Sequence, residues 1–329
     1  MPDLYLGIDT SNYKTSVAVT DSGNNIVFQR SEYLEVPRGS RGLRQSEAFF
    51  RHSCSLPSYI RDICSSVDVS CIRAAGVSSR PRRVEGSYMP CFLAGVNAAQ
   101  EISSVLNIPL HEFSHQEGHA AAVIENDPVF RRAPSVLFHL SGGTTEFLTC
   151  SPDESGYRLE ISGGTKDISI GQLADRAGVA MGYPFPSGAY LDALADSYQG
   201  HKADLPRVRV TDGCFNLSGI ETRVLRLIDS SDESEYPCIA YSLFVIISQL
   251  LFDSVLHAAA ASGADTVYMA GGVSASSFIR RSLSSRLSSM SGAAPRVIFG
   301  DPALSGDNAV GTARLARRIS LGAADIQTH

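Results

Sequence analysis

The sequence predicts an α/β fold made of two related halves. Residues 4–29 and residues 136–161 share one design, in which three short apolar runs are separated by turn residues. Each design begins with a strand that ends in a loop of small and hydroxyl-bearing residues, and helical stretches follow it. Ligands of duplicated α/β folds gather at strand ends, so we expect the two halves to face each other across a ligand cleft.

The strands can be assigned in chain order. The first half has three short runs that predict an antiparallel meander, Leu4–Ile8, Ser16–Val19 and Ile26–Phe28. The second half repeats this meander, with runs at Val136–Leu140, Glu146–Thr149 and Tyr157–Ile161. A further apolar run, Thr266–Ala270, predicts a strand that turns into a helix at Gly271-Gly272-Val273-Ser274.

The composition provides enough apolar residues for a large core. The chain has 329 residues, of which 43% are hydrophobic, and this length predicts two domains. The longest apolar stretch, Ile239–Leu256, is interrupted by polar residues, so we expect a buried helix and not a membrane span. The N-terminus has no basic segment before an apolar one, which predicts no signal peptide, and the seven cysteines form no CxxC pair. Reduced thiols and a cytoplasmic location are therefore expected.

Two histidines in the run His-Gln-Glu-Gly-His point to a metal site. His115 and His119 are four residues apart, and on a helix this spacing aims both imidazoles at one point, as in many transition-metal sites. The run is not the zinc-protease signature, because Gln116 follows the first histidine where that motif has its glutamate. The alternative is a pair of solvated histidines on a surface helix.

Loops at the predicted strand ends have the composition of phosphate-binding turns. Small residues free backbone amides and hydroxyls add donors in Asp9-Thr10-Ser11-Asn12 and in Ser141-Gly142-Gly143-Thr144-Thr145. Gly271 and Gly272 form a third such turn. None matches a Walker or dinucleotide motif, and each alone would be read as a structural turn. Their shared place at strand ends favours a nucleotide site.

The charge pattern leaves nucleic-acid binding open. The net charge is −6, which does not favour sequence-independent binding to phosphates. However, nearly all basic residues are arginine, and they cluster at residues 38–51, 80–83 and 280–286. Planar guanidinium groups can grip phosphate, although solvated surfaces explain the clusters equally well.

The order of several motifs carries a family resemblance over nearly the whole chain. The motifs are Gly7-Ile8-Asp9-Thr10-Ser11, His115 to His119, Ser141-Gly142-Gly143, Asp175, Phe185-Pro186-Ser187-Gly188, Phe215 to Gly219, Gly271 to Ala275 and Asp307-Asn308. In this order they resemble the TsaD (Kae-type) family of the actin-like ATPase superfold. The resemblance implies two duplicated actin-like α/β domains. We expect an N-terminal domain of residues 1–110, joined by the C-terminal helix, and a C-terminal domain of residues 111–329 that carries the metal and adenylate sites.

The resemblance also implies an activity. Members of this family transfer a threonylcarbamoyl group from threonylcarbamoyl-AMP to N6 of an adenosine beside the anticodon of tRNA. It implies an acyltransferase that uses one divalent metal, iron or zinc, together with ATP or threonylcarbamoyl-AMP. The expected partners are tRNA and other tRNA-modification subunits of the same pathway, with no membrane.

Roles for individual residues follow from the same resemblance. His115, His119 and Asp307 match the family's metal ligands, and His139 is a candidate fourth ligand or, alternatively, a core histidine in a strand. Ser141 to Thr145 match the loop that contacts the adenylate phosphate. Asp175, Gly188 and Asp192 match residues that hold the nucleoside, where a carboxylate can accept hydrogen bonds from both ribose hydroxyls.

Four positions depart from the family pattern. Asn12 belongs to Asn12-Tyr13-Lys14, which replaces the usual Cys-Asp-Glu, and Arg82 lies in a turn that is usually rich in glycine. Glu221 stands where lysine is common, and Ser276 replaces an asparagine that contacts the nucleotide. The chain therefore resembles a divergent paralogue. Two alternatives stay open, a carbamoyl or acyl transferase acting on a small molecule and a non-catalytic assembly subunit, although the retained metal residues argue against the second.

Overall fold

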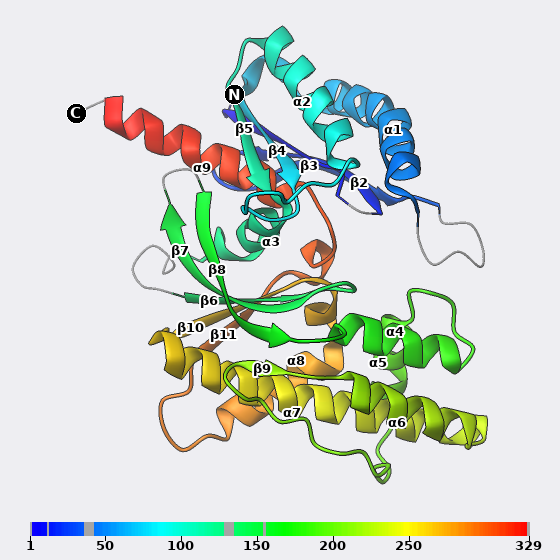
Figure 1. The fold of residues 1–329 in the computed structure, drawn as a ribbon. Coiled ribbons are helices and arrows are strands. Elements are labelled where there is room, and N and C mark those ends of the chain that lie inside the picture. Colours follow the sequence, from blue (N-terminus) through cyan, green and yellow to red (C-terminus); the bar gives the residue numbers. More distant parts are fainter. Residues whose placement is uncertain (1, 12, 36–42, 128–134, 154–155, 328–329) are drawn as a thin grey trace. The chain divides into compact units, whose positions relative to one another are not determined.

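The computed structural model describes the chain except for residues 1, 12, 36–42, 128–134, 154–155 and 328–329. The chain divides into two compact units (Figure 1). Unit 1 comprises Met1–Pro128, Pro152–Arg158 and Asp307–His329, and unit 2 comprises Val129–Ser151 and Leu159–Gly306. The segment that carries His115 and His119 belongs to unit 1, whereas a boundary after residue 110 would assign it to the C-terminal part.

Unit 1 contains a five-stranded sheet in the order β3-β2-β1-β4-β5. Its strands are β1 (Leu4–Asp9), β2 (Lys14–Asp21), β3 (Ile26–Tyr33), β4 (Ile72–Arg80) and β5 (Leu110–Ser114). The predicted meander is confirmed, since β2 pairs antiparallel with both β1 and β3. Strands β4 and β5 extend the sheet in the direction parallel to β1. Every residue of β1 is buried, because helices cover both faces of the sheet.

The helices of unit 1 are α1 (Gln45–Ser66), α2 (Phe92–Leu106), α3 (His115–Ile124) and α9 (Val310–Gln327), with a short 3-10 turn, η1, at Val69–Cys71. Side chains alternate along β1, so Leu4, Leu6 and Ile8 pack with α1 and α2, while Tyr5 packs with Ala316 of α9 on the opposite face. Figure 1 shows α1 and α2 on one side of this sheet and α9, drawn in red, on the other.

Helices α3 and α9 cross at a pair of glycines. A Cβ atom on Gly311 of α9 would lie only 1.8 Å from the carbonyl oxygen of Gly118 in α3. Only a residue without a side chain allows the two backbones to come this close. The contact holds the start of α9 beside α3, and this brings Asp307, just before α9, next to the histidines of α3.

Unit 2 contains a six-stranded sheet in the order β11-β10-β6-β7-β8-β9. Its strands are β6 (Ser135–Leu140), β7 (Thr145–Asp153), β8 (Gly156–Thr165), β9 (Cys214–Phe215), β10 (Thr266–Ala270) and β11 (Arg296–Phe299). The series β8-β7-β6-β10-β11 repeats the order β3-β2-β1-β4-β5 of unit 1. The predicted duplication of an α/β half is therefore confirmed.

Five helices belong to unit 2, within the part of it that the structure describes: α4 (Ile170–Ala180), α5 (Gly188–Ser197), α6 (Ser218–Asp229), α7 (Tyr236–Ser262) and α8 (Ser277–Ser288). Short 3-10 turns lie at Glu233–Glu235 (η3), Gly272–Ala275 (η4) and Pro302–Leu304 (η5). Helix α7 runs through the core, where Leu243, Ile247 and Leu251 pack against buried residues of the sheet and of α4 and α6.

Helix α7 with the turn before it is long and apolar enough, by length and composition alone, to cross a membrane. Within the protein, however, 61% of its most apolar stretch is buried. Core helices of globular domains have the same properties. The burial agrees with the helix expected for Ile239–Leu256.

Candidate metal centre

Helix α3 begins at His115 because a capping box fixes its first turn. The Ser114 hydroxyl accepts a hydrogen bond from the Glu117 backbone N–H, and the Glu117 carboxylate accepts one from the Ser114 N–H. This reciprocal pair satisfies backbone donors that would otherwise be free at a helix start. His115 is thus the first helical residue, and His119 lies one turn later on the same face.

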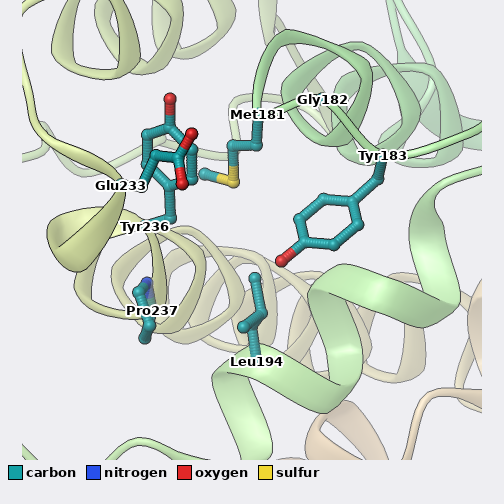
Figure 2. A pocket seen from close by; sticks show the side chains of 7 residues that line it. All are labelled: Met181, Gly182, Tyr183, Leu194, Glu233, Tyr236 and Pro237. Atoms are coloured by element: carbon teal, nitrogen blue, oxygen red, sulfur yellow. The ribbon is translucent and has the colours of Figure 1, made fainter.

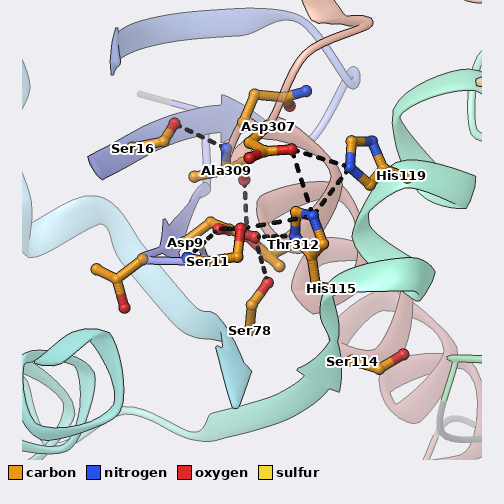
Figure 3. A network of polar contacts seen from close by, with 12 residues as sticks. Asp9, Ser11, Ser16, Ser78, Ser114, His115, His119, Asp307, Ala309 and Thr312 are labelled. Atoms are coloured by element: carbon orange, nitrogen blue, oxygen red, sulfur yellow. Dashed lines mark hydrogen bonds and ion pairs between the residues drawn. The ribbon is translucent and has the colours of Figure 1, made fainter. Parts of the chain in front are cut away.

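The two imidazoles converge with Asp307 (Figure 3). The Nε2 atoms of His115 and His119 are 3.0 Å apart. The Asp307 Oδ1 atom is 3.4 Å from the first and 3.3 Å from the second. All three residues belong to unit 1. The fold thus brings together the three residues that the sequence predicted as ligands of one metal ion.

The spacing of these three donor atoms fits one transition-metal ion. Metal–ligand bonds of about 2.0–2.1 Å at tetrahedral or octahedral angles place neighbouring ligand atoms about 2.8–3.4 Å apart. The observed separations of 3.0, 3.3 and 3.4 Å lie in this range. Two imidazoles and one carboxylate form a donor set that suits iron or zinc.

Asp9 orients His115 from behind. Its Oδ2 atom is 2.9 Å from His115 Nδ1 and accepts a hydrogen bond from the Ser78 hydroxyl at 2.6 Å. Its Oδ1 atom accepts hydrogen bonds from the backbone N–H and the hydroxyl of Ser11. A carboxylate at Nδ1 holds the proton there and turns the lone pair of Nε2 toward the other ligands.

The electrostatics of the cluster favour a positive charge at its centre. Burial lowers the pKa of His115, but the charge of Asp9 and hydrogen bonds to Asp307 and Asp9 outweigh it and raise that pKa to about 10. Burial raises the pKa of Asp307, but hydrogen bonds to both histidines hold it well below its usual value. The buried carboxylate of Asp9 and the half-buried carboxylate of Asp307 face the two imidazoles and therefore attract a cation, which is a proton or a metal ion.

The loop after β1 faces inward. Asp9, Thr10 and Ser11 are almost completely buried. The Thr10 hydroxyl donates to the Cys91 carbonyl at 3.1 Å and accepts from the Gly95 N–H at 3.1 Å. The side-chain oxygens of these residues have hydrogen-bond partners within the protein, and their contact with a phosphate stays a prediction. Asn12 lies outside the described residues.

The corresponding loop after β6 is open. The backbone of Ser141 pairs with Thr144, and the Thr144 N–H donates to the Ser141 hydroxyl, so the turn is tight. Gly142 and Gly143 are exposed, and nothing lies within 4 Å of a Cβ built on either. Thr145 is buried and accepts a hydrogen bond from the Ile170 N–H at the start of α4. The backbone of Gly142 and Gly143 is therefore open to a ligand such as a phosphate.

His139 precedes this turn on β6 and is buried. It lies opposite Ala270 of β10 and Glu146 of β7 in the sheet. It belongs to unit 2, whereas His115, His119 and Asp307 belong to unit 1. Its role as a fourth ligand stays a prediction.

Both carboxylates expected to hold the nucleoside are engaged with helix starts. Asp175 Oδ1 accepts hydrogen bonds from the N–H groups of Ser187 and Gly188 at the start of α5, at 2.7 and 3.0 Å. Burial raises the pKa of Asp175, although these two bonds oppose the shift. Asp192 accepts hydrogen bonds from the Ser276 hydroxyl and the Ser277 N–H at the start of α8. The sequence shows no sign of these long-range caps, and a ribose contact stays a prediction.

The turn after β10 depends on its first glycine. Gly271 has φ +92°, and a Cβ there would be 2.4 Å from the Leu140 carbonyl oxygen. Gly272 has open space around it. The close approach brings the end of β10 against the end of β6, as expected for turns gathered at strand ends.

Comparison with known proteins decides the family. Residues 37–313 match the sequence family described as tRNA N6-adenosine threonylcarbamoyltransferase, TsaD. The chain belongs to this family. A tRNA N6-adenosine threonylcarbamoyltransferase of Thermotoga neapolitana is 28% identical over 284 residues, which cover 85% of this chain and 84% of the relative. The chain is therefore a member of a family of transferases that modify tRNA, as its motifs predicted.

Solved structures with little sequence identity share the fold. Full-length HypF in its phosphate- and nucleotide-bound form aligns with a TM-score of 0.61 at 13% identity, over 98% of this chain and 57% of that one. Component A of the (R)-2-hydroxyglutaryl-CoA dehydratase of Acidaminococcus fermentans aligns with a TM-score of 0.56 at 13% identity, over 97% and 99%. These likenesses support the predicted actin-like α/β fold.

Residues of this TsaD-family member that depart from the family pattern make contacts within the protein. Glu221 forms an ion pair of 2.7 Å with Arg176, so its negative charge is balanced within unit 2. Ser276 caps α8 by accepting a hydrogen bond from the Ile279 N–H. Lys14 begins β2, and its Nζ atom lies 5.1 Å from the centre of the Tyr33 ring. Arg82 donates its backbone N–H to the Ser87 hydroxyl within a turn of unit 1.

A separate cavity of about 310 Å³ lies in unit 2 of this TsaD-family chain. Figure 2 shows its lining residues, which come from the turn after α4, from α5, from η3 and from the start of α7. They are Met181, Gly182, Tyr183, Leu194, Glu233, Tyr236 and Pro237. None of these residues was expected in the metal or nucleotide site.

Proposed function

We propose that this chain transfers a threonylcarbamoyl group from threonylcarbamoyl-AMP to N6 of an adenosine in tRNA, assisted by one divalent metal ion. The observation that carries the proposal is the convergence of His115, His119 and Asp307, with donor atoms 3.0–3.4 Å apart, in a member of a tRNA-modifying transferase family. Iron and zinc both suit the donor set. The proposed location is the cytoplasm, and the proposed partners include other subunits of the same tRNA-modification pathway.

Two residues of the chain would prepare the site for a metal ion. Asp9 holds His115 in one orientation, so that its Nε2 lone pair faces the same point as His119 Nε2. Asp307 brings a negative charge that helps to hold a cation. A bound divalent ion would polarise the donor carbonyl and stabilise the charge that develops on its oxygen, an effect worth several kcal/mol.

The transfer needs no covalent intermediate with the protein. The N6 amine attacks the carbamoyl carbon of the donor, the bond from that carbon to the AMP oxygen breaks, and the amine loses a proton. Adenylate is a good leaving group, so holding amine and donor close together supplies much of the rate enhancement. We infer that the open turn Ser141 to Thr145 receives the adenylate phosphate, with Asp175, Gly188, Asp192, Gly271, Gly272 and Ser276 nearby in the nucleoside site.

A direct assay tests this function. The purified chain is incubated with threonylcarbamoyl-AMP and unmodified tRNA, alone and with the pathway's partner proteins, and digested tRNA is examined by mass spectrometry for threonylcarbamoyladenosine. Modified adenosine that disappears in the His115→Ala variant supports the proposal. Metal-dependent loss of the adenylate without modified tRNA would instead indicate a small-molecule acceptor. Unchanged adenylate in every mixture, with metal bound, would indicate a non-catalytic subunit.

A further inference from the structure

Unit 2 contains a group of metal-binding side chains of its own. His201, Glu235 and Cys238 each offer one ligand atom, and these three atoms lie within 4.8 Å of one another. All three residues belong to unit 2, whereas the ligands of the candidate metal centre belong to unit 1. This His201 cluster therefore shares no residue with that centre, and an ion bound in it is independent of the proposed function.

Two members of the His201 cluster come from the start of α7. Glu235 directly precedes the helix, and Cys238 lies in its first turn. Residues three positions apart lie on one face of a helix, so the carboxylate and the thiol can reach the same ion. Cys238 is only 3% exposed, whereas Glu235 is exposed to solvent. The sulfur thus forms the inner side of the cluster and the carboxylate its outer side.

The third member comes from the segment between α5 and β9, which is attached to α7 on both sides of His201. The His201 carbonyl accepts a hydrogen bond from Cys238 Sγ at 3.4 Å. Two residues later, the Ala203 N–H donates to the Ser242 hydroxyl at 2.8 Å. Three residues earlier, the Tyr198 ring packs on a tyrosine of α7, with ring centres 5.6 Å apart. These contacts hold the backbone at His201 beside Cys238 before any ion binds.

The contacts that an ion would displace are weak. His201 Nδ1 is 3.4 Å from the Tyr198 hydroxyl, which is longer than a usual hydrogen bond between nitrogen and oxygen. The thiol of Cys238 is a weak donor, and its acceptor is the carbonyl at 3.4 Å. The imidazole and the sulfur can therefore exchange these partners for a metal ion at little cost.

The donor set is typical of a zinc site. Thiolate sulfur and imidazole nitrogen favour zinc, whereas magnesium and calcium prefer oxygen ligands. Zinc bonds of about 2.0–2.3 Å place tetrahedral ligand atoms about 3.3–3.6 Å apart. The side chains of His201 and Glu235 are exposed, so they can turn toward the buried sulfur to close a difference of up to about 1 Å.

We propose that His201, Glu235 and Cys238 bind one zinc ion. The thiol of Cys238 releases its proton to solvent as the zinc–sulfur bond forms. Three protein ligands leave a fourth position for water. The ion joins the segment between α5 and β9 to the start of α7, where Tyr236 and Pro237 line the cavity shown in Figure 2. Zinc therefore fixes one wall of that cavity.

Cobalt(II) tests the His201 cluster without interference from the other centre. Cobalt replaces zinc in such sites, and a thiolate bound to it gives an intense charge-transfer absorption that imidazole and carboxylate ligands do not give. The full chain is reduced, freed of metal with a chelator and titrated with cobalt(II). We expect this absorption to appear in the wild-type protein. The variant His115→Ala/His119→Ala should keep it, because the candidate metal centre contributes no sulfur.

Matched variants assign the absorption to the cluster. Cys238→Ala should abolish it, whereas Cys214→Ala, which removes another cysteine of unit 2, should leave it unchanged. His201→Gln changes an exposed side chain, so it decides the question even if loss of Cys238 disturbs folding. It should weaken cobalt binding about 100-fold or more, since loss of an outer partner alone costs about 10- to 100-fold. His257→Gln, at an exposed histidine of α7, is its control.

Thermal unfolding gives a second measurement. An ion that binds only the folded protein stabilises it, so zinc should raise the Tm of His115→Ala/His119→Ala, and adding His201→Gln should remove this rise. A wild-type protein without the charge-transfer absorption would overturn the inference. So would an absorption that survives in folded Cys238→Ala or is unaffected by His201→Gln. The tRNA assay concerns the other centre, and its result is decided separately.

Discussion

His115 uses both of its ring nitrogens, and this dual use sets the chemistry of the centre. One nitrogen meets Asp9 and the other faces His119 and Asp307. The arrangement resembles the carboxylate–histidine–metal relay of many metal sites, in which the outer carboxylate tunes the ligand. Asp9 thus lies directly behind the candidate metal centre, and the nucleotide contact expected from its small, hydroxyl-rich loop stays a prediction.

Removing either histidine should remove the metal. His115→Ala and His119→Ala each delete one of three ligands, so stoichiometric metal should be lost when the purified protein is measured by mass spectrometry. The circular dichroism spectrum should change little, because these residues are not part of the hydrophobic core clusters. Full metal occupancy in the double variant would show that the ion is held elsewhere.

Neutralising Asp9 should weaken metal binding without removing a ligand. Asp9→Asn keeps the size of the side chain but removes the charge that orients His115, and loss of such an outer partner typically lowers metal affinity about 10- to 100-fold. Competition with a chelator measures the change. Glu221→Gln, which changes a carboxylate in unit 2, serves as the control and should leave metal affinity as it is.

At the scale of elements, the metal centre depends on how closely α9 approaches α3. The glycine contact between Gly118 and Gly311 allows the two backbones to touch. Asp307 reaches the histidines only because the chain enters α9 at this point. Helix packing thus determines the third ligand, and no local pattern around Asp307 predicts it.

A methyl group at this crossing should separate the helices. Gly311→Ala places a Cβ atom far inside the contact distance, so we expect a loss of unfolding free energy of about 1–3 kcal/mol together with weaker metal binding. Gly322→Ala, later in the same helix and with open space around it, is the matched control. It should stabilise the protein by about 0.4–1 kcal/mol, because alanine favours helix more than glycine does. Equal stability of the two variants in urea would contradict this account.

The start of α6 gives a prediction that depends on pH. Asp167 accepts hydrogen bonds from the N–H groups of Leu217 and Ser218. Burial acts to raise the pKa of Asp167, but these backbone bonds outweigh it and lower the pKa. A carboxyl with a lowered pKa stabilises the fold above its unfolded-state pKa, and this contribution is lost as the pH falls through the folded-state value.

Asp167→Asn keeps an oxygen that can accept a hydrogen bond but removes the negative charge, so it should reduce the unfolding free energy at pH 7 by about 0.3–1 kcal/mol, the usual worth of such a charge at a helix N-terminus. The difference should shrink in strong acid, where the wild-type carboxyl is also neutral. Urea unfolding of both proteins across this pH range provides the measurement. A difference that stays constant down to strong acid would mean that the charge of Asp167 is not involved.

At the scale of the whole molecule, the repeated meander was predictable and much of the site was not. The strand runs and their turns recur in two places, so the duplicated α/β fold follows from patterns within about 30 residues. The histidine pair also follows from its spacing. By contrast, the link from Ser78 through Asp9 to His115 and the caps made by Asp175 and Asp192 join segments far apart in the sequence. Only the folded chain brings these groups within hydrogen-bond distance.

The order of segments along the chain also affects how the protein is made. Unit 1 is built from three separate stretches, and the last of them, which carries Asp307 and α9, follows Leu159–Gly306 of unit 2. On the ribosome, the two histidines therefore emerge well before the carboxylate that joins them. An incomplete chain that stops inside unit 2 lacks the third ligand and the helix that covers the sheet of unit 1. The candidate metal centre can therefore assemble only after synthesis has passed Asp307.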